Sequence, residues 1–249
     1  MSDLVINVNK EECIGCGLCV KECPAFAITI ENGKAEARKG CIECGHCYAV
    51  CPKGAITMNG YDCDNGEMAS LTDIDSDYLL NAMKSRRSIR QFTDQPVEEE
   101  KIAKILEAGR YCPTGGNSQK IAYTILGSKQ TEIEKECVKI FKLGTKAGSG
   151  FSDVLKNAEI DPDFFFKKAP LVIVVSGTDT QNASLASSYM ELMAETMGLG
   201  VLYSGFFCMC AKVSTKIKNL LKLPKGHKVV SCMVIGYPAV KYQRIPPRK

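Results

Sequence analysis

The sequence predicts an α+β protein of two domains, a small one built around cysteines and a larger one with three α/β/α layers. Eight of the 14 cysteines lie between Cys13 and Cys51, in a run that is written twice, 28 residues apart. Beyond residue 75, segments with helical periodicity alternate with apolar runs typical of buried strands. The predicted domains are therefore residues 1–60 and 75–249, with a linker of polar and glycine-containing sequence at 61–74.

Both cysteine runs have the spacing C-x2-C-x2-C-x3-C-P, which is a ligand pattern for iron–sulfur clusters. A cubane cluster takes four thiolates, of which a short loop supplies three, and in two-cluster proteins the last cysteine of each run binds the other cluster. We therefore expect two 4Fe–4S clusters. The predicted ligands of the first are Cys13, Cys16, Cys19 and Cys51, and those of the second are Cys41, Cys44, Cys47 and Cys23.

Structural zinc and disulfides are the alternatives for these cysteines. Zinc usually takes two separated pairs of ligands, whereas each run here places three cysteines within seven residues. Residues 1–10 do not resemble a secretory signal, which argues against disulfides and predicts a cytoplasmic protein. Exposed low-potential clusters would further favour an oxygen-poor cell, and therefore an anaerobe.

The repeat extends beyond the cysteines, because residues 27–30 (Ala-Ile-Thr-Ile) return as residues 55–58 (Ala-Ile-Thr-Met). Each copy predicts a ligand loop, a short helical turn through the fourth cysteine and a strand. Residues 1–60 resemble the bacterial two-cluster ferredoxin domain over their whole length. The formal charge of +4 and the lack of a run of about 20 apolar residues predict neither a nucleic-acid partner nor a membrane.

The elements of the larger domain are predicted from capping residues and periodicity. A helix capped by Ser76 or Asp77 is expected to be followed by a second helix after Pro96. Further helices are expected at 131–143, 181–197 and 207–221, and strands at 121–126, 171–175 and 229–235. The inward face of the helix at 181–197 is expected to carry Leu185, Tyr189, Leu192 and Met193. Residues 144–170 predict either a mobile segment over a pocket or a surface excursion.

Four separated stretches of this domain carry a second resemblance. They are Arg86-Arg87-Ser88-Ile89-Arg90, Pro113-Thr114-Gly115-Gly116-Asn117-Ser118-Gln119, Tyr203-Ser204-Gly205-Phe206 and Ile245-Pro246-Pro247-Arg248. Each stretch alone could be an ordinary turn or a basic helix end. Together, in this order, they resemble the FMN-binding elements of the nitroreductase family over about residues 75–249. The resemblance implies a nitroreductase-like three-layer fold and a homodimer with FMN at the subunit interface.

The same resemblance assigns flavin contacts to individual residues. Arg86 and Arg248 would bind the phosphate, Arg90 would lie at the pyrimidine edge of the ring, and Asn117 would contact its polar edge. A backbone amide at Ser204 or Gly205 would reach flavin N5. The complete predicted set is Arg86, Arg87, Ser88, Arg90, Pro113, Thr114, Gly115, Asn117, Ser118, Ser204, Gly205 and Arg248. No side chain is predicted to be catalytic. Several family members have an acidic residue in place of Ser204, which leaves the substrate open.

The cysteines outside the two runs are interpreted as packing residues. Cys208 and Cys210 on one helix would lie on different faces, and buried free cysteine behaves as a small hydrophobe. Cys112 adjoins the predicted flavin loop and could modulate the ring, although packing is the preferred interpretation. Sequence motifs of a dinucleotide-binding fold, a P-loop, a zinc protease and a serine hydrolase are absent.

Clusters of this kind pass electrons singly, whereas flavin can take up electrons singly and release them as a pair. The sequence therefore predicts an FMN-dependent oxidoreductase, in which electrons from a low-potential donor such as reduced ferredoxin pass through the clusters to FMN. The resemblance implies a nitroaromatic, a quinone or a similar conjugated organic acceptor. Three alternatives remain: an NAD(P)H-dependent flavin reductase that uses the clusters as an exit route, a flavin-fragmenting or dehalogenating enzyme, and a non-enzymatic electron carrier or redox sensor.

Overall fold

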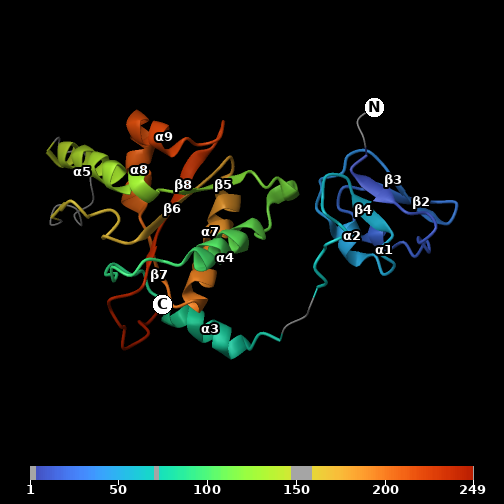
Figure 1. Ribbon diagram of the computed structural model, residues 1–249, viewed down its shortest axis with the longest axis horizontal. Helices are drawn as coiled ribbons and strands as arrows, with labels where there is room; N and C mark the ends of the chain where they lie inside the picture. Colours follow the sequence, from blue (N-terminus) through green and yellow to red (C-terminus); the bar gives the residue numbers. More distant parts are fainter. Residues whose placement is uncertain (1–3, 70–72, 147–158, 249) are drawn as a thin grey trace. The chain divides into compact units, whose positions relative to one another are not determined.

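The structure, a computed structural model, describes residues 4–69, 73–146 and 159–248 (Figure 1). Its contacts divide the chain into two compact units. The N-terminal unit comprises Met1–Asp73 and the short segment Thr114–Ser118, and the C-terminal unit comprises Ile74–Pro113 and Gln119–Lys249. The N-terminal unit is thus larger than residues 1–60, because most of the expected linker and a segment from the later chain belong to it.

The N-terminal unit repeats in structure as it does in sequence. Its helices are α1 (Leu18–Lys21) and α2 (His46–Val50), and its strands are β1 (Ile6–Val8), β2 (Ile28–Glu31), β3 (Lys34–Ala37) and β4 (Ile56–Met58). Strand β1 pairs with β4 and β2 with β3, both antiparallel. A shift of 28 residues carries β1 onto β3, β2 onto β4 and α1 onto α2. Both helices end before the fourth cysteine of their run, so the expectation that they continue through it is wrong.

The C-terminal unit is built on a four-stranded antiparallel sheet in the order β5-β6-β8-β7. Its strands are β5 (Ile121–Ile125), β6 (Leu171–Gly177), β7 (Gly200–Tyr203) and β8 (Lys228–Gly236). Its helices are α3 (Ser76–Ser85), α4 (Glu99–Arg110), the short 3-10 helix η2 (Gly127–Lys129), α5 (Gln130–Lys146), α7 (Thr180–Thr196), α8 (Gly205–Val213) and α9 (Thr215–Leu221). Within the described ranges, none of the helices combines the length and the apolar character needed to cross a bilayer.

Helices cover both faces of this sheet, which gives the three layers that the sequence predicts (Figure 1). Side chains of a strand alternate between its two faces. Val172 and Val174 of β6 pack with residues of α5, α8 and α9. Ile173 and Val175 pack with residues of α4 and α7 on the opposite face. The sheet is therefore buried on both sides, and β6 is buried along its entire length.

Two predictions for the helices of this unit are wrong. The buried residues of α7 are Ala183, Ala186, Ser187, Met190, Glu191 and Ala194. Leu185 and Tyr189, which the apolar pattern places inside, are 41% and 44% exposed. Small side chains allow α7 to lie close to the sheet. The face of α7 that carries the small residues therefore packs against the sheet, in place of the face that carries the large apolar residues. The expected helix at 207–221 is two helices, because Ser214 is extended and its Oγ accepts a hydrogen bond from Ile217 N at 3.2 Å.

The segment that leads into β6 contributes to the core. Residues 147–158, which include much of the expected mobile segment, lie outside the described residues. Phe165 and Phe166 are 1% and 0% exposed, so a surface excursion is wrong for this part of 144–170. Their backbone N–H groups both donate to Glu134 Oε1, at 3.0 and 2.9 Å. Glu134 of α5 therefore fixes the chain just before β6.

Glu134 should make the stability of the C-terminal unit depend on pH. Burial raises the pKa of Glu134 to about 7 from 4.5, although the N–H groups of Phe165 and Phe166 oppose this shift. The folded state then holds a proton that the unfolded state has released, so stability is full below about pH 4.5 and is lost as the pH rises through 7. Glu134→Gln should remove this loss, which amounts to on the order of 3 kcal/mol at 1.36 kcal/mol per pKa unit between 4.5 and about 7.

Urea unfolding of the wild type and of Glu134→Gln at pH 5 and pH 8 measures this difference. Glu132→Gln is the control, because Glu132 lies on the same helix and forms an exposed ion pair with Lys216 at 3.0 Å. Its effect should stay within the small range of surface pairs at both pH values. Equal pH dependence in the wild type and in Glu134→Gln would contradict the assignment.

Candidate iron–sulfur and flavin sites

The N-terminal unit contains two cavities, each lined by four cysteines. One is lined by Cys13, Cys16, Cys19 and Cys51. The other is lined by Cys23, Cys41, Cys44 and Cys47. Each cavity thus takes three cysteines from one run and the fourth from the other run. These are the two sets that the spacing assigns to two clusters, although ligation itself stays a prediction.

Backbone N–H groups point at the sulfurs of these cavities. Ala27 N donates to Cys23 Sγ at 3.2 Å, and Ala55 N, 28 residues later, donates to Cys51 Sγ at 3.3 Å. Ala35 N lies 3.4 Å from Cys13 Sγ, and this bond is the main cause that lowers the pKa of that thiol. Such donors stabilise thiolates and help to set the potential of a bound cluster. The donor set therefore fits an anionic cluster.

The ligand loops are also shaped by close backbone contacts. Gly15 has φ +66°, and a Cβ atom at this position would lie 2.0 Å from the carbonyl oxygen of Gly33. Only glycine fits there. Burial raises the pKa of Cys47 to about 11, so loading of a metal on this thiol must release a proton. Among the described residues, no group of three or more His, Cys, Asp or Glu side chains is arranged to hold a single metal ion.

Two of the four predicted flavin stretches come together in the C-terminal unit, and the chain that leads to a third returns to them. The segment Arg86–Arg90 runs beside β7, with Ile89 N donating to Val201 O at 3.1 Å. The chain after β8 returns to the same segment, where Ala239 N donates to Gln91 O at 2.9 Å. The strand β7 leads directly to Ser204. The segment Arg86–Arg90, the start of α8 and the chain just after β8 thus belong to one region.

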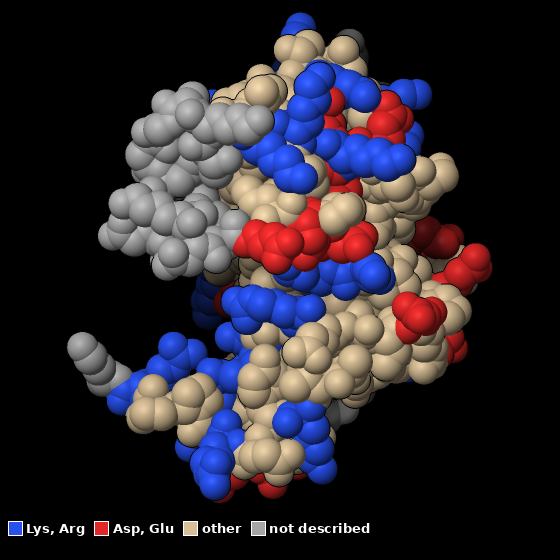
Figure 2. Space-filling view, turned by 90° about the vertical axis from the view of Figure 1, so that its left-hand side faces the viewer, with Lys and Arg blue, Asp and Glu red and all other residues tan. Residues whose placement is uncertain are grey.

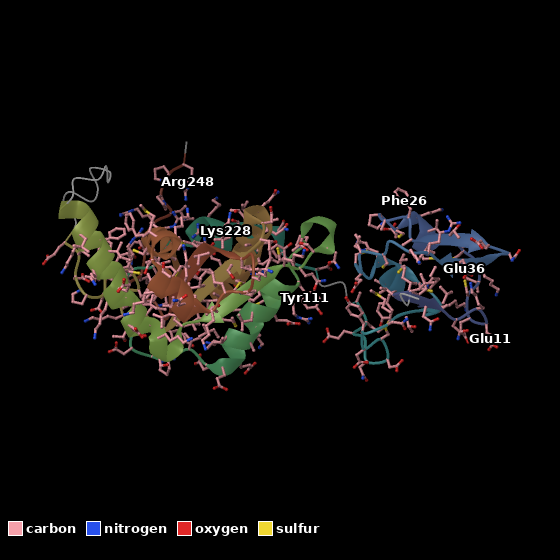
Figure 3. The ribbon with its side chains drawn as sticks, turned by 90° about the horizontal axis from the view of Figure 1, so that it is seen from above. Glu11, Phe26, Glu36, Tyr111, Lys228 and Arg248 are labelled. Carbon is pink, nitrogen blue, oxygen red and sulfur yellow. The ribbon has the colours of Figure 1, made fainter. Side chains whose placement is uncertain are left out.

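The arginines of this region have different partners. Arg86 Nη1 donates to Glu191 Oε1 at 2.7 Å, so the guanidinium predicted to bind phosphate already has a carboxylate partner. Arg87 Nη2 donates to Lys84 O at 2.8 Å, but its buried Nε has no hydrogen-bond partner. Arg90 and Arg248 are exposed, and Figure 3 shows Arg248 at the end of the C-terminal tail. An orphaned, buried guanidinium donor fits an anionic ligand such as a phosphate.

The start of α8 offers backbone donors next to open space. Ser204 precedes the helix and is 7% exposed, and its N–H donates to Cys232 O at 2.8 Å. A Cβ atom added at Gly205 would meet nothing within 4 Å. The first N–H groups of a helix lack intrahelical partners. Because the Ser204 N–H is already used, the Gly205 N–H is the amide of the predicted pair that fits a hydrogen bond to a flavin nitrogen.

Most of the predicted stretch at 113–119, namely Thr114–Ser118, groups with the N-terminal unit, whereas Pro113 and Gln119 group with the C-terminal unit. It contains the short 3-10 helix η1 (Gly115–Asn117). The side-chain amide of Asn117 donates to Ile42 O at 3.1 Å and to Glu43 O at 2.9 Å. The predicted flavin contact of Asn117 stays a prediction, and its observed partners are in a cysteine loop.

The remaining cysteines match their interpretation as packing residues. Cys210 is 1% exposed in the core, while Cys208 is partly buried at the edge of that core. Cys112 is buried next to Pro113, and burial raises its pKa. Sequence reasoning missed Glu191, a buried acid on α7. Its signal was available, because Glu191 shares the small-residue face of Ala183, Ser187 and Ala194 at helical spacing.

Comparisons with known proteins agree with both halves of this description. A model of the nitroreductase family matches residues 83–237, and a model of the 4Fe–4S dicluster domain matches residues 12–56. An NADPH-dependent oxidoreductase of Staphylococcus haemolyticus is 27% identical over 175 residues. The match covers 66% of this chain and 66% of that protein, just under two thirds of its length.

Solved structures show the same fold for the C-terminal part. Nitroreductases with bound FMN from Desulfitobacterium hafniense and Bacteroides fragilis align with TM-scores of 0.58 and 0.55, at 20% and 22% identity. Each alignment covers 68% of this chain and 94% of the other chain. Because the family match at residues 83–237 spans more than half of the sequence, the chain belongs to the nitroreductase family, and it carries a 4Fe–4S dicluster domain at its N-terminus.

Proposed function

We propose that the protein is an iron–sulfur flavoprotein oxidoreductase that transfers electrons from a low-potential donor, by way of two 4Fe–4S clusters and FMN, to a conjugated organic acceptor. The observation that carries this proposal is the pair of four-cysteine cavities in a member of the nitroreductase family. FMN, when bound, supplies the chemistry that couples single electrons to a two-electron reduction. Nitroaromatics and quinones are the proposed acceptors.

The side chains of this chain bind and orient rather than react. The eight cysteines of the two cavities would hold the clusters. Arg87 would donate to the flavin phosphate through its orphaned Nε, and the amides at the start of α8 would donate to the flavin ring. Arg90, exposed beside Ser88, could place a positive charge near the ring and favour its reduced form. No protein acid or base is assigned.

A homodimer is part of the proposal, and exposed apolar side chains support it. Tyr78 and Leu80 of α3 are 76% and 53% exposed, and the α7 residues Leu185 and Tyr189 are also exposed. Such exposed apolar side chains on α3 and α7 would be buried in a dimer interface.

The charge pattern of the surface bears on nucleic-acid binding. On the face shown in Figure 2, clusters of Lys and Arg side chains are interrupted by Asp and Glu side chains. This pattern differs from the continuous basic stripe of many nucleic-acid-binding proteins.

A second function, direct reduction of FMN by NAD(P)H, is favoured by one comparison. The Staphylococcus haemolyticus relative is named an NADPH-dependent oxidoreductase, and its match covers 66% of this chain. In this case the clusters would pass electrons outward. The two functions differ in which cofactor is reduced first.

Anaerobic stopped-flow spectroscopy separates the two functions. The purified protein is first assayed for iron, sulfide and FMN per chain, and is then mixed with reduced ferredoxin or with NADPH. Fast reduction by ferredoxin and slow reduction by NADPH support the clusters as the entrance. Fast bleaching of FMN by NADPH, followed by the clusters, supports the second function. A protein prepared without air that contains neither iron nor FMN would contradict both.

A further inference from the structure

The second cysteine loop has a strained residue where the first has glycine. Gly15 lies between Cys13 and Cys16, and its counterpart 28 residues later is Glu43. Both have positive φ, +66° for Gly15 and +57° for Glu43. A left-handed conformation costs a residue with a side chain more than it costs glycine. The second loop therefore needs contacts that hold Glu43 in this conformation.

Two contacts hold Glu43 from within its own part of the chain. Its N–H donates to Cys41 Sγ at 3.3 Å, and its carboxylate accepts a hydrogen bond from Tyr61 Oη at 2.8 Å. This bond is also the main cause that raises the pKa of Tyr61. Neither contact binds the carbonyl groups of the loop.

Those carbonyl groups are held by Asn117. The Nδ2 amide of Asn117 donates to Ile42 O at 3.1 Å and to Glu43 O at 2.9 Å, which uses both protons of a carboxamide NH2 group. Ile42 and Glu43 are the two residues between Cys41 and Cys44. In the first loop, Lys34 Nζ instead donates to Cys13 O at 2.5 Å. The two loops thus have different supports, and that of the second comes from 74 residues along the chain.

The segment of Asn117 is shaped to present this amide. Gly116 and Asn117 have φ +59° and +51°, and Asn117 N donates to Thr114 O at 2.9 Å. Asparagine adopts the left-handed conformation more readily than most residues with a side chain. Contacts place Thr114–Ser118 in the N-terminal unit. The segment therefore contacts the loop of Cys41 and Cys44, which lines the second cavity.

We propose that Asn117 is a positioning residue of the second 4Fe–4S cluster. By holding the carbonyl groups of Ile42 and Glu43, its carboxamide keeps Cys41 and Cys44 in the arrangement that binds the cluster. This inference rests on the proposed cluster binding and adds a residue outside both cysteine runs. It also predicts an asymmetry: loss of Asn117 affects the second cluster and leaves the first unchanged.

Two substitutions in the full-length, anaerobically purified protein test the inference. Asn117→Asp keeps the shape and replaces the donor by an oxygen that repels both carbonyl groups. Asn117→Gly keeps the left-handed backbone and removes the side chain. The control is Asn59→Asp, because Asn59 Nδ2 also donates to a backbone carbonyl of this unit, Leu4 O at 2.7 Å, away from the cysteine loops.

Release of iron to a chelator and the EPR spectrum of the dithionite-reduced protein are measured. In both Asn117 variants, we expect half of the iron to be released on the order of tenfold faster than in the wild type, which is the scale of two lost hydrogen bonds. We also expect one of the two cluster signals in the EPR spectrum to change. Asn59→Asp should match the wild type. Wild-type kinetics and signals in Asn117→Asp and Asn117→Gly would overturn the inference, as would loss of FMN with unchanged iron release. Absence of iron from the wild type would instead overturn the proposed function, and this inference with it.

Discussion

Replacing Cys51 by alanine is expected to remove one cluster and to leave the other in place. Cys51 lies in the second run but lines the cavity of Cys13, Cys16 and Cys19. A cubane that loses one of four thiolates is held by three and exposed to solvent at the vacant corner. Iron should therefore fall from about eight to about four atoms per chain, the content of a single 4Fe–4S cluster.

The crossed arrangement predicts which double variants are additive. Cys16 lines the same cavity as Cys51. The double variant that combines Cys16→Ala and Cys51→Ala should therefore lose no more iron than either single variant. Cys44 lines the other cavity, so Cys44→Ala with Cys51→Ala should lose almost all iron. Iron and sulfide analysis with EPR of the reduced protein measures both results.

Cys63→Ala is the matched control for these variants. Cys63 belongs to the same unit, and its Sγ accepts a hydrogen bond from Met58 N at 3.2 Å. It lines neither cavity. This variant should keep about eight iron atoms per chain. If Cys44→Ala with Cys51→Ala retained half of the iron, the two cysteines would serve one cluster and the crossed assignment would be wrong.

The sequence predicted the N-terminal half well because its chemistry is local and repeated. Ligand spacing fixes which cysteines can share a cluster, and the 28-residue period recurs in strands and helices. The apolar runs that became β6 and β8 were equally clear, since both strands are buried on two faces. The short strand β7 has no such run and went unpredicted, because two of its four residues are only partly buried.

Contacts between residues distant in sequence could not be predicted in the same way. Nothing near Asn117 indicates that its amide binds carbonyl groups 74 and 75 residues earlier. The buried face of α7 depends on how closely the helix approaches the sheet, and apolar periodicity alone favoured Leu185 and Tyr189. Glu191 also lies on that buried face, where it pairs with Arg86. Arg86 was therefore assigned to a ligand when its observed partner is a carboxylate.

Arg86→Leu is expected to destabilise the C-terminal unit strongly. The side chains of Arg86 and Glu191 are 27% and 10% exposed, and their atoms Nη1 and Oε1 are 2.7 Å apart. Removal of Arg86 leaves a carboxylate buried without its cation, which typically costs about 3 to 5 kcal/mol. Arg86→Leu with Glu191→Leu removes both charges and should recover most of this loss, since an apolar pair can replace a buried ion pair. Urea unfolding of the wild type, the two single variants and the double variant measures the coupling energy between Arg86 and Glu191.

Arg87→Leu is the matched comparison, because Arg87 is the neighbouring arginine and its buried Nε has no partner. This variant should unfold near the wild-type urea concentration, yet bind FMN roughly 10 to 100 times more weakly, the scale of one hydrogen bond to a charged group. Riboflavin, which lacks the phosphate, should bind to the wild type and to Arg87→Leu with equal affinity. In Arg86→Leu with Glu191→Leu, the ratio of FMN to riboflavin affinity should stay at the wild-type value. If this ratio fell in the double variant and not in Arg87→Leu, Arg86 would be the phosphate ligand and Glu191 would be only its resting partner.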